Sequence, residues 1–363
     1  MQTQRRNNSS ENGIVLILVI IVLTIISTIV VDFVFSTQID YEISANTIKE
    51  LKADYIAKSG VNVLSGTFKT RDLEQLAKFG SAVAGIEVEN KDKWSLKVPT
   101  FPVGEGFVTM VIEDERSKIN LNGLVNSATN RIDFQVLTAL TELFRYQGVE
   151  NDKVQLFLAS LINWLDRPLE GSQNDQDSRG AGNDYYQSLD NPYTIKDGPL
   201  DSVAEIKMIK GMDEDFYNAV KDYVTVYPSN KQVNFSTASK PVMIAVLKAA
   251  EVSAIQQAND SSQKLDDDLA GRIADAIIDE RQKDPVVTRR EVRDTILDID
   301  SSIGLSSGLS GLVLNSGTSE IFSINSTGII GEENPVISNV AAVVNKKRVG
   351  RSSEIDIISW KQR

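Results

Sequence analysis

The chain has 363 residues, of which 41% are hydrophobic and 24% charged, and its 50 acidic against 38 basic residues give a net charge of −12. This composition is that of a globular protein long enough for two domains, and its acidity argues against non-specific nucleic-acid binding. Cysteine and histidine are both absent. Their absence excludes disulfides, thiolate or histidine metal sites, and the Ser-His-Asp and Cys-His nucleophile arrangements.

An uncharged, mostly apolar run extends from Ile14 to Val31. A helix of this length would measure roughly 27 Å, close to the ~30 Å hydrocarbon core of a bilayer. The run is longer than the apolar core of a cleavable signal peptide, and Asp32 rather than a small residue follows it. Arg5 and Arg6 precede the run and favour an N-terminus in the cytoplasm. The sequence therefore predicts a retained membrane anchor.

Beyond the anchor the hydrophobic period changes twice. Apolar residues recur at helical spacing as far as Gly60, so we expect one helix over residues 14–60. Residues 94–122 read as strands, residues 126–315 as helices, and the tail as three strands of an antiparallel meander. Because strands flank the helical block, we expect a helical insertion in a β domain.

Several polar motifs have a structural interpretation. We expect Asn120, Asn122 and Asn234 to close turns, and Asp114 and Glu115 to lie on a solvated strand end rather than to form an acid-base pair. We expect Trp94, Trp164 and Trp360 to be core or interface residues.

A helical hairpin around Gly211 resembles those that bind DNA phosphates, and it carries Lys207 and Lys210. Asp213 and its acidic neighbours follow directly and would repel phosphates, so we predict a structural module.

Residues 163–184 form a polar, glycine-rich stretch with many side-chain oxygens. Calcium prefers six to eight oxygen ligands on such flexible loops. The candidate ligands are Asp166, Asp175, Asp177 and Asp184. The alternative interpretation is a solvated loop that only turns the chain.

Four features occur together and in a fixed order: the basic leader ending at Gly13 before an apolar helix, "DERSKINLN" at 114–122, "LINWLDRPLEG…GAGNDYY…NPYTIKDGPLDSVAEIKMIKGM" at 161–212, and "VNFSTAS" at 233–239. With the strand tail ending in "ISW", they resemble the minor pseudopilin K family of type II secretion systems over nearly the full chain. The resemblance implies an α+β, pilin-like fold: a long N-terminal helix packed on an antiparallel sheet, interrupted by a large inserted helical domain of the sterile-alpha-motif-like kind.

The resemblance divides the chain into five segments. These are a leader (1–13), a transmembrane and spine helix (14–60), the first part of the β domain (61–125), the inserted helical domain (126–315) and the C-terminal strands (316–363).

The resemblance also implies processing. Prepilin peptidase would cut between Gly13 and Ile14 on the cytoplasmic side, and the new N-terminus would be N-methylated. Mature position five is then Leu18, where most pilin-like subunits carry glutamate. An unpaired carboxylate in lipid would cost several kcal/mol, so Leu18 suits a tip subunit with no neighbour above it. Any membrane anchor would also accept leucine there.

By resemblance the chain is a structural subunit and not an enzyme. The resemblance implies a single-pass inner-membrane protein with a cytoplasmic N-terminus, which after assembly would lie at the periplasmic tip of the pseudopilus. Its expected partners are the I- and J-type minor pseudopilins, with which it initiates assembly for export across the outer membrane, prepilin peptidase and the inner-membrane secretion platform. No nucleic-acid partner is expected.

Members of this family bind calcium in the inserted domain. In this chain Asn163, Pro168 and Gly182 stand where acidic residues are common. The calcium expectation therefore depends on the remaining acids of the loop.

Two alternatives fit the same anchor. A minor pilin of a type IV pilus shares the leader and spine, and neighbouring genes for I- and J-type pseudopilins would separate it. An uncleaved, membrane-anchored extracytoplasmic binding protein would keep Arg5 and Arg6, which N-terminal analysis detects.

Overall fold

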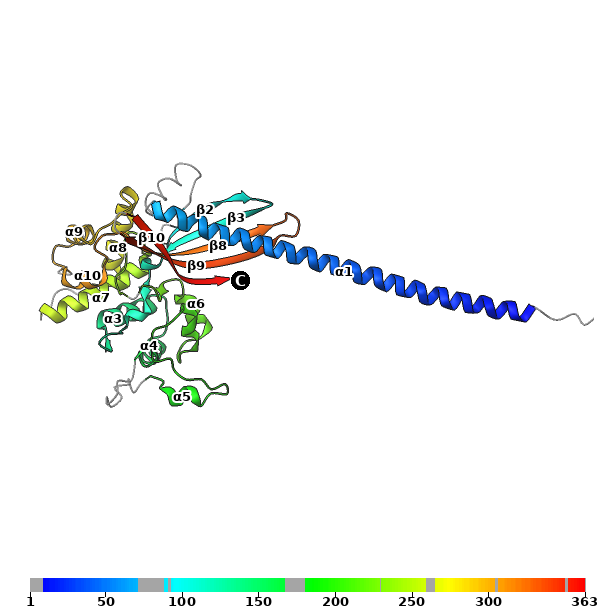
Figure 1. Ribbon diagram of the computed structural model, residues 1–363. Coiled ribbons are helices and arrows are strands. Elements are labelled where there is room, and N and C mark those ends of the chain that lie inside the picture. The colour runs from blue at the N-terminus through cyan, green and yellow to red at the C-terminus, as the bar shows by residue number, and fades with distance from the viewer. Residues whose placement is uncertain are drawn as a thin grey trace, which may run out of the picture.

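The computed structural model describes residues 9–70, 88–90, 93–166, 180–228, 230–258, 265–303, 306–349 and 352–362. The long helix α1 (Ser9–Thr70) projects from a globular part built by the rest of the chain (Figure 1). The described residues form two hydrophobic cores, one between α1 and a sheet and one inside a block of helices. The predicted α+β class, with a long N-terminal helix on an antiparallel sheet, is confirmed.

The main sheet has six strands in the order β1-β2-β3-β8-β9-β10, and every neighbouring pair is antiparallel. The strands are β1 (Val88–Asn90), β2 (Lys93–Val103), β3 (Gly106–Asp114), β8 (Ile321–Ile330), β9 (Val336–Val349) and β10 (Ser352–Gln362). The last three form the predicted meander. Since β3 pairs directly with β8, the helical elements are an insertion between two neighbouring strands.

Helix α1 lies lengthwise along the sheet (Figure 1). Phe68 stacks on Phe322 of β8 with ring centroids 5.0 Å apart. A Cβ on Gly60 would lie 2.3 Å from Ser326 Oγ, and one on Gly328 would lie 2.1 Å from the Ala53 oxygen. As the residue number rises along α1, the contacted residue number in β8 falls, so α1 is antiparallel to β8.

The predicted helix bounds of 14–60 are wrong, because α1 begins at Ser9 and ends at Thr70. Gly60 does not end the helix. It lies at a close approach between the helix and the sheet, where a side chain would meet Ser326. The buried positions continue past it with Val61, Leu64 and Phe68, which keep the last turns of α1 on the sheet.

The strand prediction for residues 94–122 holds for β2, β3 and the two-residue strand β4. In β3, residues Val108, Met110 and Ile112 are buried in strict alternation, which is the pattern of a strand with one covered face. After Asp114 the chain forms short 3-10 turns and two-residue strands instead. These elements are η1 (Glu115–Ser117), β4 (Ile119–Asn120), η2 (Leu121–Gly123), β5 (Val125–Asn126) and β6 (Arg131–Ile132).

The insertion packs its helices around the second core. Its further elements are α3 (Phe134–Tyr146), α4 (Asn151–Leu165), α5 (Asn183–Gln187), η3 (Val203–Met208), α6 (Glu214–Val220), β7 (Val224–Thr225), α7 (Lys240–Ala258), α8 (Asp267–Lys283), α9 (Arg289–Ile299) and α10 (Ser306–Leu312). Thr288 and Glu291 form a capping box at the start of α9. In the predicted helical hairpin, the segment before Gly211 is the 3-10 element η3.

Candidate functional site

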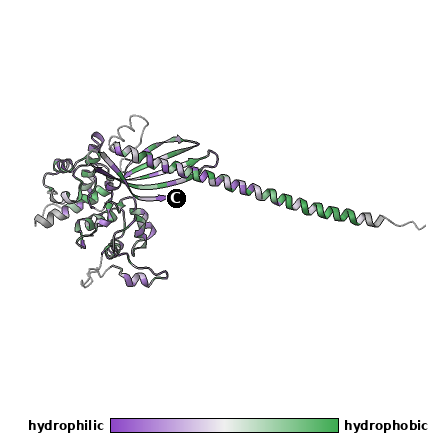
Figure 2. Ribbon diagram, viewed as in Figure 1, coloured by the Kyte–Doolittle hydropathy of each residue, from purple (hydrophilic) through white to green (hydrophobic). Residues whose placement is uncertain are grey.

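The first half of α1 is the most exposed apolar surface of the described chain. Figure 2 shows it as a continuous hydrophobic stretch that projects away from the globular part. The predicted processing residues Gly13 and Ile14 and the predicted position-five residue Leu18 all lie in this stretch, and the Leu18 side chain is 60% exposed. The helix is long and apolar enough to cross a membrane.

A second feature is a buried polar cluster where β3 enters the insertion. Asp114 Oδ1 accepts hydrogen bonds from the Arg116 amide (2.8 Å) and Ser319 Oγ (2.5 Å). Asp114 Oδ2 accepts from Asn234 Nδ2 (2.9 Å) and Thr237 Oγ1 (2.6 Å). Asp114 therefore joins the entry of the insertion, its middle and its exit.

The expectation that Asp114 and Glu115 lie on a solvated face is wrong. Asp114 is fully buried, and Glu115 is 7% exposed. Burial raises the pKa of the Asp114 carboxyl, while the hydrogen bonds from Ser319, Thr237, Asn234 and the Arg116 amide oppose the rise. A carboxyl held by four internal donors has a structural role.

The charges that flank Asp114 pair across the same junction. Lys118 Nζ lies 2.8 Å from Glu113 and 3.5 Å from Glu115, and although burial opposes it, these two carboxylates raise the pKa of Lys118. Arg116 reaches Glu320, 3.0 Å away just before β8. The "DERSK" segment (residues 114–118) is thus a buried junction between the sheet and the insertion, and its charged side chains are paired.

Of the three predicted turn asparagines, Asn120 and Asn234 close turns or cap short helices, whereas the Asn122 side chain bonds to distant backbone instead. Asn120 accepts from the Asn122 amide at 2.9 Å, and Asn234 accepts from the Ser236 amide at 3.1 Å. The Asn122 side chain also crosses to the backbone of Leu200, which it binds at both N–H (2.7 Å) and carbonyl (3.0 Å). The local turns were predictable, but the bond to a residue far along the chain was not.

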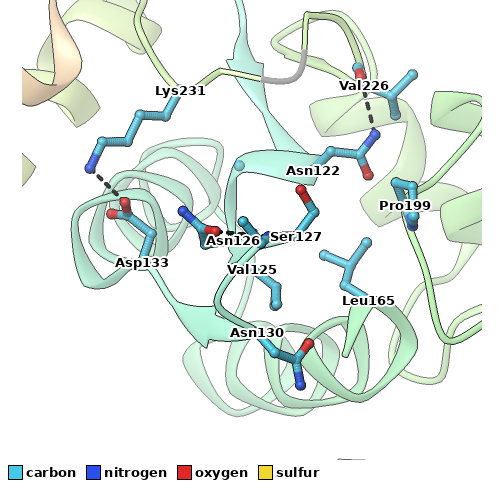
Figure 3. Close-up of a pocket in the computed structure, with 12 residues that line it drawn as sticks. Asn122, Val125, Asn126, Ser127, Asn130, Asp133, Leu165, Pro199, Val226 and Lys231 are labelled. Carbon is cyan, nitrogen blue, oxygen red and sulfur yellow. Dashed lines mark hydrogen bonds and ion pairs between the residues drawn. The ribbon is translucent and has the colours of Figure 1, made fainter. Parts of the chain in front are cut away.

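Beside this region lies a cavity of about 380 Å³ (Figure 3). Its walls include Asn122, Asn130, Asp133 and Lys231. Lys231 Nζ lies 2.5 Å from Asp133, Asn122 donates to the Val226 carbonyl at 3.1 Å, and Asn130 donates to Asp166. These lining groups satisfy one another, so they do not by themselves select a ligand.

The predicted calcium ligands fall into two groups. Asp175 and Asp177 lie outside the described residues. Asp166 lies at the end of α4, where it accepts a hydrogen bond from Asn130, and Asp184 is in the first turn of α5. Within the described part of the chain, no three acidic side chains are grouped closely enough to hold a metal.

The structure adds one acid that the sequence did not single out. Burial raises the pKa of Asp197, and the negative charge of Asp166 raises it further, so the two carboxyls are electrostatic neighbours. Asp197 also has a left-handed backbone, with φ of 50°. Because Asp197 and Asp166 are far apart in the sequence, their interaction could not be predicted from the sequence pattern.

The hairpin around Gly211 is packed as a structural module, with Ile206, Ile209 and Phe216 buried. Lys207 pairs with Glu214 at 2.7 Å, and Lys210 lies over the Tyr185 ring, 4.0 Å from its centroid.

The tryptophans differ in their surroundings. Trp164 is buried and donates to Glu205 at 3.0 Å, whereas Trp360 is 38% exposed. The side-chain environment of Trp94 lies outside the described structure.

Comparisons with known proteins agree with the fold. Residues 117–229 match the family model described as "Type II secretion system (T2SS), protein K". Type II secretion system protein K of Pseudomonas aeruginosa PAO1 is 26% identical over 240 residues, which cover 66% of this chain and 68% of the relative. The protein of the same name from Pectobacterium carotovorum is 25% identical over 246 residues, covering 66% and 71%.

A solved structure, the crystal structure of the GspK-GspI-GspJ complex from the enterotoxigenic Escherichia coli type 2 secretion system, contains a chain with the same fold. The TM-score is 0.54 at 17% identity, and the match covers 90% of this chain and 99% of that chain. The expected pilin-like fold is thereby confirmed. Taken together, the family match, the relatives and the shared fold show that the chain is similar to type II secretion system protein K.

Proposed function

We propose that the chain is a minor pseudopilin at the tip of the type II secretion pseudopilus, a structural subunit rather than an enzyme. It would initiate assembly with the I- and J-type minor pseudopilins and support export across the outer membrane. The observation that carries the proposal is α1, a single helix that joins an exposed apolar half to a half docked on a pilin-like sheet. The structural neighbour named above was solved in a complex with GspI and GspJ, which supports this choice of partners.

The two halves of α1 suit a subunit that changes environment. In the membrane the apolar half is covered by lipid, and in a filament it must be covered by the helices of other subunits. Because α1 runs without a break through Gly13, cutting before Ile14 would leave the whole apolar half in the mature protein. Leu18 adds no carboxylate to that surface.

The tip position is supported by the insertion. It forms a broad helical block beside the sheet (Figure 1), and the buried Asp114 cluster fixes it to β3 and β8. A lateral block of this kind, held rigidly, would obstruct stacking of identical subunits along a thin filament. We infer that the subunit lies at the end of the filament, with a cytoplasmic N-terminus before assembly and contact with the inner-membrane platform.

We also propose that the acidic loop binds calcium. The negative charge of Asp166 raises the pKa of Asp197, and a cation bound near both carboxyls would relieve this repulsion. With Asp175, Asp177 and Asp184 they supply the oxygen donors that calcium prefers. Bound calcium would stabilise this side of the insertion by linkage and would carry out no catalytic step.

The assembly proposal is tested by co-purification from detergent-solubilised membranes. The full-length chain is co-expressed with tagged I- and J-type pseudopilins, and an unrelated single-pass membrane protein serves as the control. Recovery of both pseudopilins with this chain, and not with the control, is the expected result. Recovery of neither, or cross-linking that finds this chain repeated along the filament shaft, would contradict the proposal.

A further inference from the structure

The two edges of the six-stranded sheet are built differently. At one edge, β2 pairs with the three-residue strand β1 and contains Pro99 and Pro102, which cannot donate backbone hydrogen bonds. At the other edge, the described strands leave the outer side of the 11-residue strand β10 without a neighbour. The stretch from Ile357 to Trp360 in β10 has no charge, proline or glycine. The charged residues Asp356 and Lys361 flank this stretch, and a bulge lies between Ile357 and Ser359. The edge therefore offers a short uncharged, apolar stretch for pairing rather than a long regular strand.

Large apolar side chains gather on the same edge. Ile357 pairs with Val344 and Trp360 with Ala342, and residues paired across strands lie on one face of a sheet. Val344 and Ala342 are buried in the core under α1, so Ile357 and Trp360 lie on that face beyond the helix. They are 50% and 38% exposed, and Ile358, at the bulge between them, is 44% exposed.

The direction of β10 is fixed relative to the membrane anchor. Helix α1 is antiparallel to β8, as its contacts show, and the chain reverses at β9 and again at β10. β10 is therefore antiparallel to α1 and ends on the side from which α1 projects (Figure 1). A partner strand that pairs with β10 must run parallel or antiparallel to it, and therefore has a fixed direction relative to α1.

A second copy of the chain does not fit this edge. Antiparallel pairing of two β10 strands places a two-fold axis perpendicular to the sheet, which would point the two α1 anchors in opposite directions. A two-fold axis along the strands would place like backbone groups opposite each other. Pairing of β10 with the far edge of another copy would meet only the short β1 and the proline-containing β2.

We propose that the β10 edge, with Ile357, Ile358 and Trp360, is the docking surface for a different pilin-like subunit anchored in the same membrane. The partner would add an edge strand to β10 through main-chain hydrogen bonds and cover the three apolar side chains. The inference rests on the proposed function, which supplies a partner whose helix runs alongside α1. Since α1 itself contacts β10, this edge lies beside the helix, where a subunit packed along α1 on that side could reach it.

The lack of cysteine allows a direct test. Single-cysteine variants Ile358→Cys and Trp360→Cys of the full-length chain are labelled with a photoreactive maleimide in membranes that contain tagged I- and J-type pseudopilins. Thr100→Cys, exposed on β2 near the opposite edge, is the matched control. We expect adducts with one tagged pseudopilin at both β10 positions, about tenfold or more above the control. Adducts only with a second copy of the chain, or equal yields at all three positions, would overturn the inference.

A charge substitution provides a second readout. Trp360→Glu is expected to reduce recovery of the partner about tenfold or more, whereas Thr100→Glu leaves it unchanged. The melting temperature of each variant is compared with that of the parent chain, so that a loss of docking is distinguished from a loss of folding. Undiminished recovery with Trp360→Glu contradicts this docking surface but leaves the proposed function intact. Failure of the unmodified chain to recover either pseudopilin contradicts the proposed function instead.

Discussion

The Asp114 carboxylate accepts a hydrogen bond of 2.9 Å from the side-chain amide of Asn234, a residue 120 positions further along the chain. Asp114 ends β3, and Asn234 lies in the middle of the insertion. With Ser319, which precedes β8, these residues close the insertion on the sheet at a single buried point. The orientation of the helical block is therefore set by hydrogen bonds as well as by apolar packing.

Replacing Asp114 with asparagine keeps the size of the side chain but puts a donor among four donors. We expect Asp114→Asn to lower the free energy of unfolding by about 2–4 kcal/mol, because buried polar groups lose their partners. Urea unfolding followed by circular dichroism measures the loss. Asp201→Asn is the control, since the Asp201 side chain is 88% exposed. A loss no greater than that of the control would show that the cluster does not hold the insertion.

Two glycines of α1 give a matched pair. A Cβ at Gly60 would clash with Ser326, whereas one at Gly66 would meet nothing within 4 Å. We expect Gly60→Ala to destabilise the protein by about 1–3 kcal/mol through overpacking. Gly66→Ala should stabilise it by about 0.5–1 kcal/mol, because alanine favours the helix. Thermal unfolding measures the melting temperatures of the two variants. Equal changes in melting temperature would contradict the close packing of α1 on the sheet at Gly60.

Local patterns predicted those parts of the fold that depend on local sequence. The apolar run of α1, the alternation in β3 and the capping box at Thr288 are all readable from neighbouring residues. Gly60 was misread because a glycine at a helix end and a glycine at a close contact look alike in one sequence. The contact that distinguishes them comes from β8, far along the chain.

The buried cluster was hidden for the same reason. Asp114 follows a strand, and the residues that bury it come from the middle and end of the insertion. The pKa of Asp197 is likewise raised by burial and by the charge of Asp166, an effect that neighbouring residues in the sequence do not show. Single-sequence patterns predict which residues form a helix or strand, but not which distant polar groups meet.

Acid should weaken a surface ion cluster of the insertion. Hydrogen bonds from Arg145 and Lys248 lower the pKa of Asp267 to about 2. Its folded-state pKa is below the unfolded value, so its contribution to stability is present above about pH 4 and is lost as the pH falls toward 2. The contribution should be below about 1 kcal/mol, because the Asp267 side chain is 47% exposed.

The measurement compares urea midpoints of the parent chain and Asp267→Asn between about pH 5 and pH 2. The difference between the two proteins should shrink as the pH falls. A difference that stays constant, or grows in acid, would show that this carboxylate does not stabilise the fold by pairing.

Calcium should raise the melting temperature of the full-length chain relative to the same protein in chelator, since binding to the folded state stabilises it. Asp166→Asn and Asp197→Asn should each reduce this rise, and Asp201→Asn should not. Calorimetric titration with calcium measures the binding itself. Absence of heat and of any thermal shift in the parent chain would contradict the calcium proposal.

The identity of the N-terminus tests the account of α1 most directly. The protein is purified from the membranes of its native cell, and its N-terminal peptide is identified by mass spectrometry. We expect the chain to begin at Ile14 with a methylated amine, so that the apolar half of α1 is kept and the basic leader is lost. A mature protein that still begins at Met1 or Gln2, with Arg5 and Arg6 in place, would contradict the account.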